Sequence, residues 1–402
     1  MNPLKKIYCR IFQGVMKLLI PVFPYREPKL LDGIDEIIPL LKEKKIERIL
    51  LVTDGVIHSL GLTAPLENLL KENNIECTVY NETLPNPTSD NVEDARALYV
   101  INKCQGIIAF GGGSPMDCAK GVGARIVKPK TLLWEMQGLI KIRKQLPLLI
   151  AIPTTAGTGS ETTVASVIVD SHSHQKYVIN DFCLIPQYAV LAPEVTVGLP
   201  KHLTSTTGMD ALTHAVEAYI GRSRTKDTKK ASEQAVKLIF ENLEKAYENG
   251  ADIDARKNML HASYLAGTAF TKSYVGYVHA VAHSLGGKYG VPHGLANAVL
   301  LPHVLRAYGK GAHKPLAELA KAVGLVDETT SNKYAAEKFI SHIEGMNARM
   351  NIPTKLDCLV ASDIKEMARH ANKEGNPLYP VPVLWNAKEL EKIYLAVINQ
   401  DK

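Results

Sequence analysis

Residues 106–117 read Gly-Ile-Ile-Ala-Phe-Gly-Gly-Gly-Ser-Pro-Met-Asp, and this stretch decides the fold of the first half of the chain. Its first five residues form a short apolar run, typical of a strand buried on both faces of a parallel sheet. We expect a helix from about Cys118, and Pro115 suits its first turn because no backbone N–H is needed there. The stretch therefore predicts a strand, a glycine-rich turn and a helix in succession.

The turn itself suits a phosphate group. Gly111, Gly112 and Gly113 allow positive φ angles and let the backbone approach a ligand closely. Backbone N–H groups and the N-terminus of the following helix attract an anion. The spacing is not the usual GxGxxG, and an ordinary tight turn is the alternative. The position between a buried strand and a helix favours a phosphate-binding loop.

Strands and helices alternate from about Pro24 to Leu199. This alternation predicts an α/β fold with a doubly wound sheet and a ligand site at the carboxyl ends of its strands. We therefore assign residues 1–199 to an N-terminal α/β dinucleotide-binding domain of the Rossmann-like kind. Strands are expected at 46–52, 76–81, 106–110 and 148–152, and helices at 65–73 and 90–103.

Polar side chains follow several of these strands. Asp54 comes after the first strand, where a carboxylate accepts hydrogen bonds from ribose hydroxyls or, alternatively, caps a helix. The loop Pro153–Thr163 holds five threonines, one serine and two glycines. Their hydroxyls need partners if they are buried, and a dinucleotide provides them, whereas a solvated loop is the alternative. Lys176 is either a phosphate or ribose contact or a surface lysine.

The chain after Pro200 shows helical periodicity, which predicts an all-helical metal-binding domain over residues 200–402. Asp210 and His214 form an i, i+4 pair, as do His279 and His283, so each pair shares a helix face. Four of the 13 histidines fall between His279 and His303. A carboxylate with several imidazoles suits Fe or Zn better than Ca or Mg. Histidines that cap or bridge helices are the alternative for each residue taken singly.

Composition excludes some classes of protein. The 402 residues carry a net charge of +6 with no basic block, so we expect no nucleic-acid partner. The six cysteines are scattered, which indicates a reducing, cytoplasmic environment. No apolar run reaches the ~20 residues of a membrane span.

The first two dozen residues form a separate feature. Ile7, Ile11, Val15, Leu18 and Leu19 recur at helical spacing among basic residues. One interpretation is an amphipathic helix on a membrane surface. The other, which the interrupting charges favour, is a helix docked on the protein itself or on a second subunit.

Four motifs in this order resemble the iron-containing (group III) alcohol dehydrogenase family. They are Gly111–Asp117, Pro153–Glu161, Gly208–His214 and the segment from His279 through His293 to Ala298, and the resemblance runs from about Lys29 to about Ala396. It implies the dehydroquinate-synthase-like architecture, an α/β dinucleotide-binding domain plus an all-α domain with the active site in the cleft between them. It also implies a homodimer or larger homo-oligomer.

The resemblance assigns roles position by position. Asp210, His214, His279 and His293 resemble the four metal ligands, and His283 resembles a catalytic histidine near the nicotinamide and the substrate. Spacing alone did not separate His283 from His279. An acidic residue at Asp54 favours NAD over NADP. The other cofactor contacts implied are Asn86, Gly111, Gly112, Gly113, Ser114, Thr154, Thr155, Thr158 and Lys176.

Three departures from the family pattern fall just before the metal-site histidine His279. Lys272, Tyr274 and Tyr277 replace smaller or less charged residues, so we expect them to line the substrate pocket.

The expected function is a metal-dependent oxidoreductase. It would transfer a hydride reversibly between NAD and a primary alcohol or diol and the corresponding aldehyde, with Fe²⁺ or Zn²⁺ as Lewis acid. A cyclase or lyase of the dehydroquinate-synthase kind, which uses NAD transiently, is the alternative. A metal-dependent hydrolase is a third interpretation.

Overall fold

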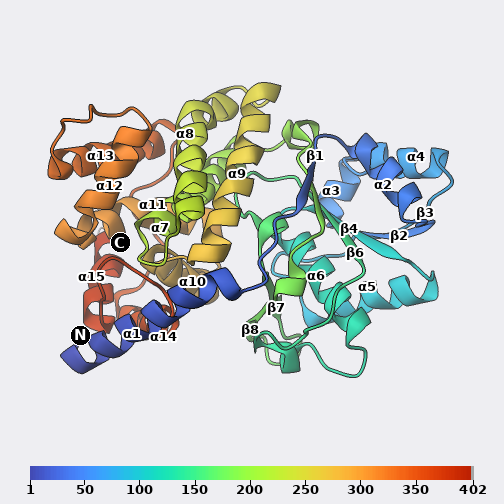
Figure 1. The fold of residues 1–402 in the computed structure, drawn as a ribbon, viewed down its shortest axis with the longest axis horizontal. Helices are drawn as coiled ribbons and strands as arrows, with labels where there is room; N and C mark the ends of the chain where they lie inside the picture. Colours follow the sequence, from blue (N-terminus) through green and yellow to red (C-terminus); the bar gives the residue numbers. More distant parts are fainter. Residues whose placement is uncertain (400–402) are drawn as a thin grey trace. The chain divides into compact units, whose positions relative to one another are not determined.

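The computed structural model describes residues 1–399, and the chain forms two compact units. One unit is Pro24–Leu199 (Figure 1). The other combines Met1–Phe23 with the chain from Pro200 onward. Each unit is described by itself below.

The α/β unit is built on a six-stranded sheet in which every neighbouring pair is parallel. In spatial order the strands are β1 (Lys29–Leu31), β9 (Tyr188–Val190), β6 (Leu148–Pro153), β4 (Gly106–Gly111), β2 (Arg48–Val52) and β3 (Glu76–Tyr80). The step from β2 to β3 runs toward one edge of the sheet, whereas β4, β6 and β9 follow one another toward the other edge. The order therefore reverses between β2 and β4, which is the position where ligands bind in such sheets.

Two apolar cores lie on the two faces of this sheet. Leu50 and Ile107 belong to one core, whereas their neighbours Leu51 and Ile108 belong to the other. Successive residues of a strand point to opposite faces, so both faces of β2 and β4 are covered. The predicted doubly wound sheet is confirmed. Helices α2 (Ile37–Glu43) and α4 (Ala64–Glu72) cover one face, and α5 (Ser89–Ile101) and α6 (Gly113–Val127) cover the other.

A second, three-stranded sheet of this unit was not predicted. It consists of β5 (Gly138–Leu139), β8 (Lys176–Asn180) and β7 (Ala165–Val169), with β7 and β8 antiparallel. Exposed and buried residues alternate along β8, so it lacks the continuous apolar run that marks the strands of the large sheet.

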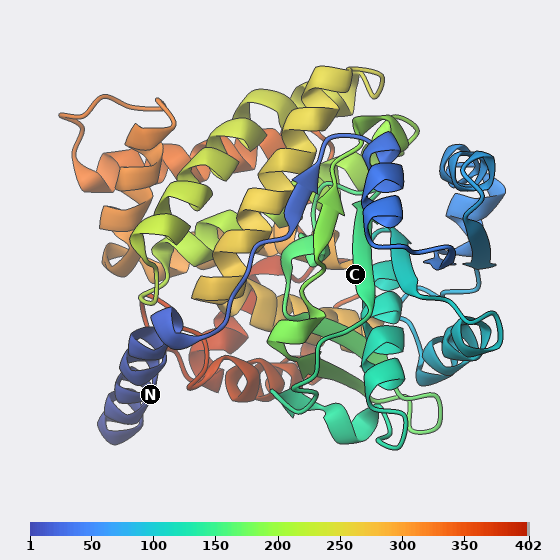
Figure 2. The same ribbon diagram turned by 45° about the vertical axis from the view of Figure 1, so that its right-hand side comes forward.

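The second unit contains no sheet among its described residues and confirms the predicted helical region (Figure 2). Its central helix is α7 (Lys201–Ile220), in which every residue from Gly208 to Ile220 is buried. No helix among the described residues is long and apolar enough to cross a bilayer. The other helices are α8 (Lys226–Glu248), α9 (Ile253–Ser273), α10 (Tyr277–Tyr289), α11 (His293–Tyr308), α12 (Lys310–Ala322), α13 (Asn332–Arg349), α14 (Ile364–Gly375) and α15 (Ala387–Val397).

The N-terminal helix α1 (Pro3–Leu19) groups with the helical unit and not with residues 24–199, although the sequence assigned residues 1–199 to one domain. The reason lies in polar contacts. Arg10 donates to the carbonyls of Val381 and Pro382, at 2.8 Å each. Gln13 donates to the carbonyl of Tyr379 at 2.7 Å. In Figure 1 the helix lies beside α14.

Candidate metal centre and cofactor loops

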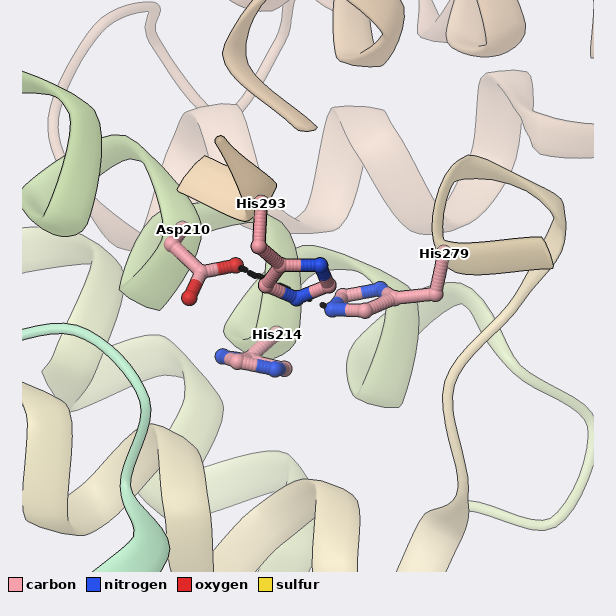
Figure 3. Close-up of side chains that lie close together, drawn as sticks. All are labelled: Asp210, His214, His279 and His293. Atoms are coloured by element: carbon pink, nitrogen blue, oxygen red, sulfur yellow. Dashed lines mark ion pairs between the residues drawn. The ribbon is translucent and has the colours of Figure 1, made fainter. Parts of the chain in front are cut away.

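Three helices of the second unit bring four predicted ligands together. Asp210 and His214 lie one turn apart on α7, His279 lies on α10, and His293 is the first residue of α11. One ligand atom from each lies within 4.8 Å of the others. Figure 3 shows the carboxylate and the imidazoles converging from different helices. Residues up to 83 positions apart in the sequence (293 minus 210) therefore form one cluster.

Three ligand atoms of this cluster surround a common point. Nδ2 of Asn297 lies 2.6 Å from Oδ1 of Asp210, 3.2 Å from Nε2 of His279 and 3.1 Å from Nε2 of His293. The amide has two N–H groups and so donates to at most two of these atoms at once, but the three distances place the carboxylate oxygen and both imidazole nitrogens around one position. Inward-pointing oxygen and nitrogen acceptors of this kind fit a transition-metal ion.

A carboxylate behind His279 sets the direction of its ring. Nδ1 of His279 lies 2.6 Å from Oε2 of Glu217, which also accepts from the backbone N–H of Gly276 at 2.8 Å. The other carboxylate oxygen accepts from the N–H of Val278 at 2.8 Å. With the Nδ1 proton donated to Glu217, Nε2 is left as the acceptor that faces Asp210. Glu217 is not among the residues expected from the sequence.

Burial sets the charge states in the cluster. Desolvation, reinforced by the neighbouring His214, His293 and His283, lowers the pKa of His279 well below its usual value, so its imidazole is neutral. Desolvation also raises the pKa of Asp210. His214 is held by stacking, because its ring lies 4.1 Å from that of Phe270 and 4.5 Å from that of His279. Neutral imidazoles are the form that binds a metal.

His283 lies beside the cluster but outside the ligand set. Its ring centroid is 5.3 Å from that of His293, and its Nδ1 lies 2.6 Å from Oε1 of Glu374 on α14. The hydroxyl of Tyr379 donates to the same oxygen at 2.7 Å. Burial opposes ionisation of Glu374, but His283 and Tyr379 together hold its pKa below the usual value. The imidazole is half-exposed, so it lies between a partly buried carboxylate and solvent.

The expectation that Tyr277 lines a substrate pocket is wrong. Its side chain is fully buried and stacks on Trp385 at 5.1 Å between centroids. Its hydroxyl donates to Asn376 at 2.9 Å. The expectation rested on its place just before His279 in the family pattern, but two residues correspond to about 200° around a helix, so Tyr277 points to another side of α10 and into the core. Lys272 and Tyr274 are partly buried, and their role in a pocket stays a prediction.

In the α/β unit, two predicted cofactor loops lie side by side at the carboxyl ends of β4 and β6. Gly111 pairs with Pro153, and the N–H of Thr154 donates to the carbonyl of Gly111 at 3.1 Å. A Cβ atom at Gly112 would lie 3.4 Å from Oγ1 of Thr155, and one at Gly113 would lie 3.4 Å from Cγ2 of Thr158. A Cβ atom at either glycine would thus be in van der Waals contact with the threonine-rich loop, so the two loops pack closely.

Glycine is required at the first of these positions. Gly111 has a φ of +153°, and a Cβ atom there would lie 2.5 Å from Cγ of Pro115. The helix α6 begins at Gly113, five residues before the predicted start, and its N-cap Gly112 supplies no side chain to cap it. The first N–H groups of α6 therefore have no side-chain cap, which suits a helix that binds a phosphate group.

The remaining predicted cofactor residues lie at the same edge. Nζ of Lys176 donates to Oδ1 of Asn86 at 2.8 Å, and the N–H of Asn86 donates to Oγ of Ser114 at 3.3 Å. Asp54 follows β2, where its Oδ1 accepts from the N–H of Ile57 at 2.9 Å and caps the short helix α3 (Gly55–Ser59). The capping role considered from the sequence is therefore observed, and one carboxylate oxygen serves it.

A buried lysine below the threonine-rich loop was missed. Lys120 on α6 is fully buried, and its Nζ donates to backbone or hydroxyl oxygens of Ser160, Thr163 and Ala165. Desolvation lowers its pKa to about 8. A lysine within an otherwise apolar helix was the sequence feature that could have predicted this buried residue. For Glu217 the signal was its place seven residues after Asp210, on the same face of α7.

Comparison with protein families gives two matches that together span most of the chain. A profile described as "Iron-containing alcohol dehydrogenase" matches residues 31–193. A second, "Fe-containing alcohol dehydrogenase family, C-terminal", matches residues 204–398.

Individual relatives agree with these profiles. 1,3-Propanediol dehydrogenase from Klebsiella pneumoniae is 38% identical and is matched over 94% of this chain and 97% of its own. NAD-dependent methanol dehydrogenase from Bacillus methanolicus is 36% identical over 80% of this chain and 84% of its own. The crystal structure of a 1,3-propanediol oxidoreductase superposes with a TM-score of 0.89, at 36% identity, over 94% of this chain and all of the other.

Proposed function

Because this chain belongs to the iron-containing alcohol dehydrogenase family, we propose that it interconverts small primary alcohols or diols and their aldehydes at a metal held by Asp210, His214, His279 and His293. It is an NAD-dependent alcohol and aldehyde oxidoreductase. The relatives reported above are named as dehydrogenases and an oxidoreductase, which favours this reaction over the cyclase alternative.

The single observation that carries the proposal is the convergence of one carboxylate oxygen and three imidazole nitrogens within 4.8 Å. One carboxylate and three neutral imidazoles suit Fe²⁺ or Zn²⁺. When bound, the metal supplies positive charge that lowers the pKa of the alcohol, and the nicotinamide ring exchanges the hydride. Glu217 orients His279 for this task through the 2.6 Å hydrogen bond at Nδ1.

In this proposal, His283 and Glu374 transfer the proton of the alcohol hydroxyl. Nδ1 of His283 is engaged by the Glu374 carboxylate, so Nε2 is the nitrogen that takes the alcohol proton or returns it. The nearby negative charge stabilises the imidazolium that forms. Because the ring is half-exposed, the proton then passes to solvent.

The cofactor roles rest on the two loops of the α/β unit. The triple glycine, Ser114 and the N-terminus of α6 are proposed to hold the phosphates, with Thr154, Thr155 and Thr158 beside them. Asp54 lies next to the position where the strand order reverses, and we assign its second oxygen to a ribose hydroxyl. Asn86 and Lys176 are proposed as further cofactor contacts.

The substrate proposal draws on the diol dehydrogenase relative. At 38% identity over nearly the full length of both chains, 1,3-propanediol is the first compound to try. We further propose a homodimer or larger homo-oligomer in the cytoplasm. All six cysteines are free, as a reducing compartment requires.

The test is reconstitution with Fe²⁺ or Zn²⁺ followed by assays with small alcohols, diols and aldehydes and NAD(H). Net NADH must accumulate with alcohols, whereas a cyclase would regenerate NAD⁺. The His279→Ala variant should lose both metal and turnover but bind NAD as the wild type does. His370→Ala, at an exposed histidine of α14, serves as the control. Turnover by metal-free His279→Ala would refute the proposal.

A further inference from the structure

The N-terminal helix α1 is attached to the helical unit through its polar side. Cys9 and Gln13 are its buried residues. Gln13 donates to the carbonyls of Pro377 and Tyr379, and Lys17 donates to that of Arg222 at 3.0 Å. Together with the two hydrogen bonds of Arg10 described above, these contacts hold one side of the helix against the segment around residue 380.

The opposite side of α1 is apolar and faces outward. Large apolar side chains are exposed at intervals of three or four residues, which places them in one stripe along the helix. Within α1 the most exposed are Leu18 at 78%, Leu4 at 76% and Ile11 at 62%. An ordinary surface helix turns its apolar stripe to the core, so this orientation is inverted. The stripe, including its continuation after the helix, is Leu4, Ile7, Tyr8, Ile11, Val15, Leu18, Leu19 and Val22.

The segment is also strongly basic. The first acidic residue of the chain is Glu27, whereas Lys5, Lys6, Arg10 and Lys17 all lie within α1. Lys5, Lys6 and Lys17 are exposed. Lys5 lies at the edge of the apolar stripe, whereas Lys6 and Lys17 lie toward the polar side, where Lys17 reaches the carbonyl of Arg222. The helix therefore combines an outward apolar stripe with a basic polar side.

The helix lies outside the catalytic fold that the relatives share. The family profiles cover residues 31–193 and 204–398, and α1 precedes both. In both views it lies at the periphery of the helical unit (Figures 1 and 2). No residue of α1 belongs to the proposed metal or cofactor sites, so its exposed stripe needs a separate explanation.

We propose that α1 is a docking surface for an anionic lipid bilayer. An apolar stripe opposite a basic polar side is the pattern of a helix that lies in the plane of a membrane surface. The apolar side chains enter the acyl boundary, and the lysines contact anionic headgroups. The hydrogen bonds of Arg10 and Gln13 keep the helix attached to the enzyme while its other side is buried in lipid.

A second copy of the chain fits this surface less well. A helix of 17 residues offers a footprint of only about 250 Å², from a length of ~25 Å and a width of ~10 Å. A stable protein interface takes about 800 Å² from each partner. Pairing two such helices would also bring lysines of like charge together, with no acidic residue on α1 to compensate.

The experiment is co-sedimentation of the full-length protein with phosphatidylcholine vesicles, with and without phosphatidylglycerol. We expect binding to the anionic vesicles and a fall in binding as salt rises. The double variant Ile11→Asp/Leu18→Asp should lose this binding yet unfold at the wild-type temperature, because both side chains are exposed. Lys5→Gln/Lys6→Gln should weaken it by about fivefold per lysine. Ile101→Asp, at an exposed isoleucine of α5, is the matched control.

The outcomes separate the explanations. Absence of wild-type binding at low salt, or undiminished binding by Ile11→Asp/Leu18→Asp, would overturn the proposal. Sedimentation velocity without lipid tests whether α1 instead contacts a second copy of the chain. In that case the double variant should dissociate into smaller species, and the wild type should not bind to vesicles. Alcohol turnover without lipid should be the same for all variants, so failure here is distinguishable from failure of the proposed reaction.

Discussion

Oε2 of Glu217 lies 2.6 Å from Nδ1 of His279, and both side chains are buried. The two residues are 62 positions apart in the chain, on α7 and α10. The carboxylate also accepts the N–H groups of Gly276 and Val278, so it holds the start of α10 as well as the imidazole. Glu217 therefore fixes both the start of α10 and the orientation of the His279 ring.

The first prediction concerns this glutamate. Glu217→Gln exchanges a carboxylate for an amide of the same shape, which no longer accepts from three donors. We expect metal affinity to fall by about 10–100-fold. Competition with a chromogenic chelator measures it, and Glu366→Gln at an exposed site of α14 is the control. Wild-type affinity in Glu217→Gln would remove the orienting role.

Gly276 offers an independent test of the same contact. A Cβ atom there would lie 2.6 Å from Oε1 of Glu217, although the backbone φ of −134° is open to any residue. Gly276→Ala should therefore displace the carboxylate and lower metal affinity by about tenfold or more. Gly287→Ala, where nothing lies within 4 Å of the added atom, should not. Equal affinities in the two variants would contradict the argument.

Glu374 is predicted to be a positioning residue for His283. Glu374→Gln removes the charge opposite Nδ1, so kcat should fall by about 100-fold, within the usual contribution of acid–base catalysis. Metal content and the Kd for NAD should stay at wild-type values. Glu374→Asp should restore part of the rate, and imidazole should partly rescue His283→Ala. An unchanged kcat in Glu374→Gln would show that the contact has no part in the reaction.

Asp54 is predicted to govern the choice between NAD and NADP. Asp54→Asn keeps an oxygen to cap α3 but removes the charge that repels a 2′-phosphate. The ratio of kcat/KM for NAD to that for NADP should fall by about tenfold, since a single charge is worth on the order of 1 kcal/mol or more near a protein surface. Thermal stability should be almost unchanged. A constant cofactor ratio would argue against the ribose contact.

Glu161 provides a prediction on pH and stability. It is buried with no hydrogen-bond partner for either carboxylate oxygen among the described residues, and desolvation raises its pKa from 4.5 to about 7. Between these values the folded protein keeps a proton that the unfolded chain has lost, so wild-type stability declines as pH rises from 4.5 to about 7.

Glu161→Gln removes that titration. Above pH 7 the free energy of unfolding should exceed that of the wild type by about 1–3 kcal/mol, and the difference should vanish below pH 4.5. Urea unfolding at several pH values measures it, with Glu72→Gln at an exposed site as control. A difference in unfolding free energy that does not depend on pH would show that ionisation of Glu161 is not its cause.

Local patterns in the sequence were enough for the strands, the glycine-rich turn and most helices. Continuous apolar runs marked β2, β4 and β6 because both faces of those strands are buried. The i, i+4 pairs on α7 and α10 followed from helix geometry alone. The strands β7 and β8 are as long as β2, but buried residues alternate in them with more exposed ones, so they were not predicted.

The inward or outward direction of individual side chains was decided only by tertiary packing. His279 and His283 share one face of α10 in the sequence, yet one is buried at the cluster and the other half-exposed against Glu374. The same holds for α1, whose apolar periodicity predicted a helix but not that its polar side would be the attached one. Periodicity fixes the relation between residues of one helix, whereas the rotation of that helix against its neighbours depends on contacts with residues far away in the chain.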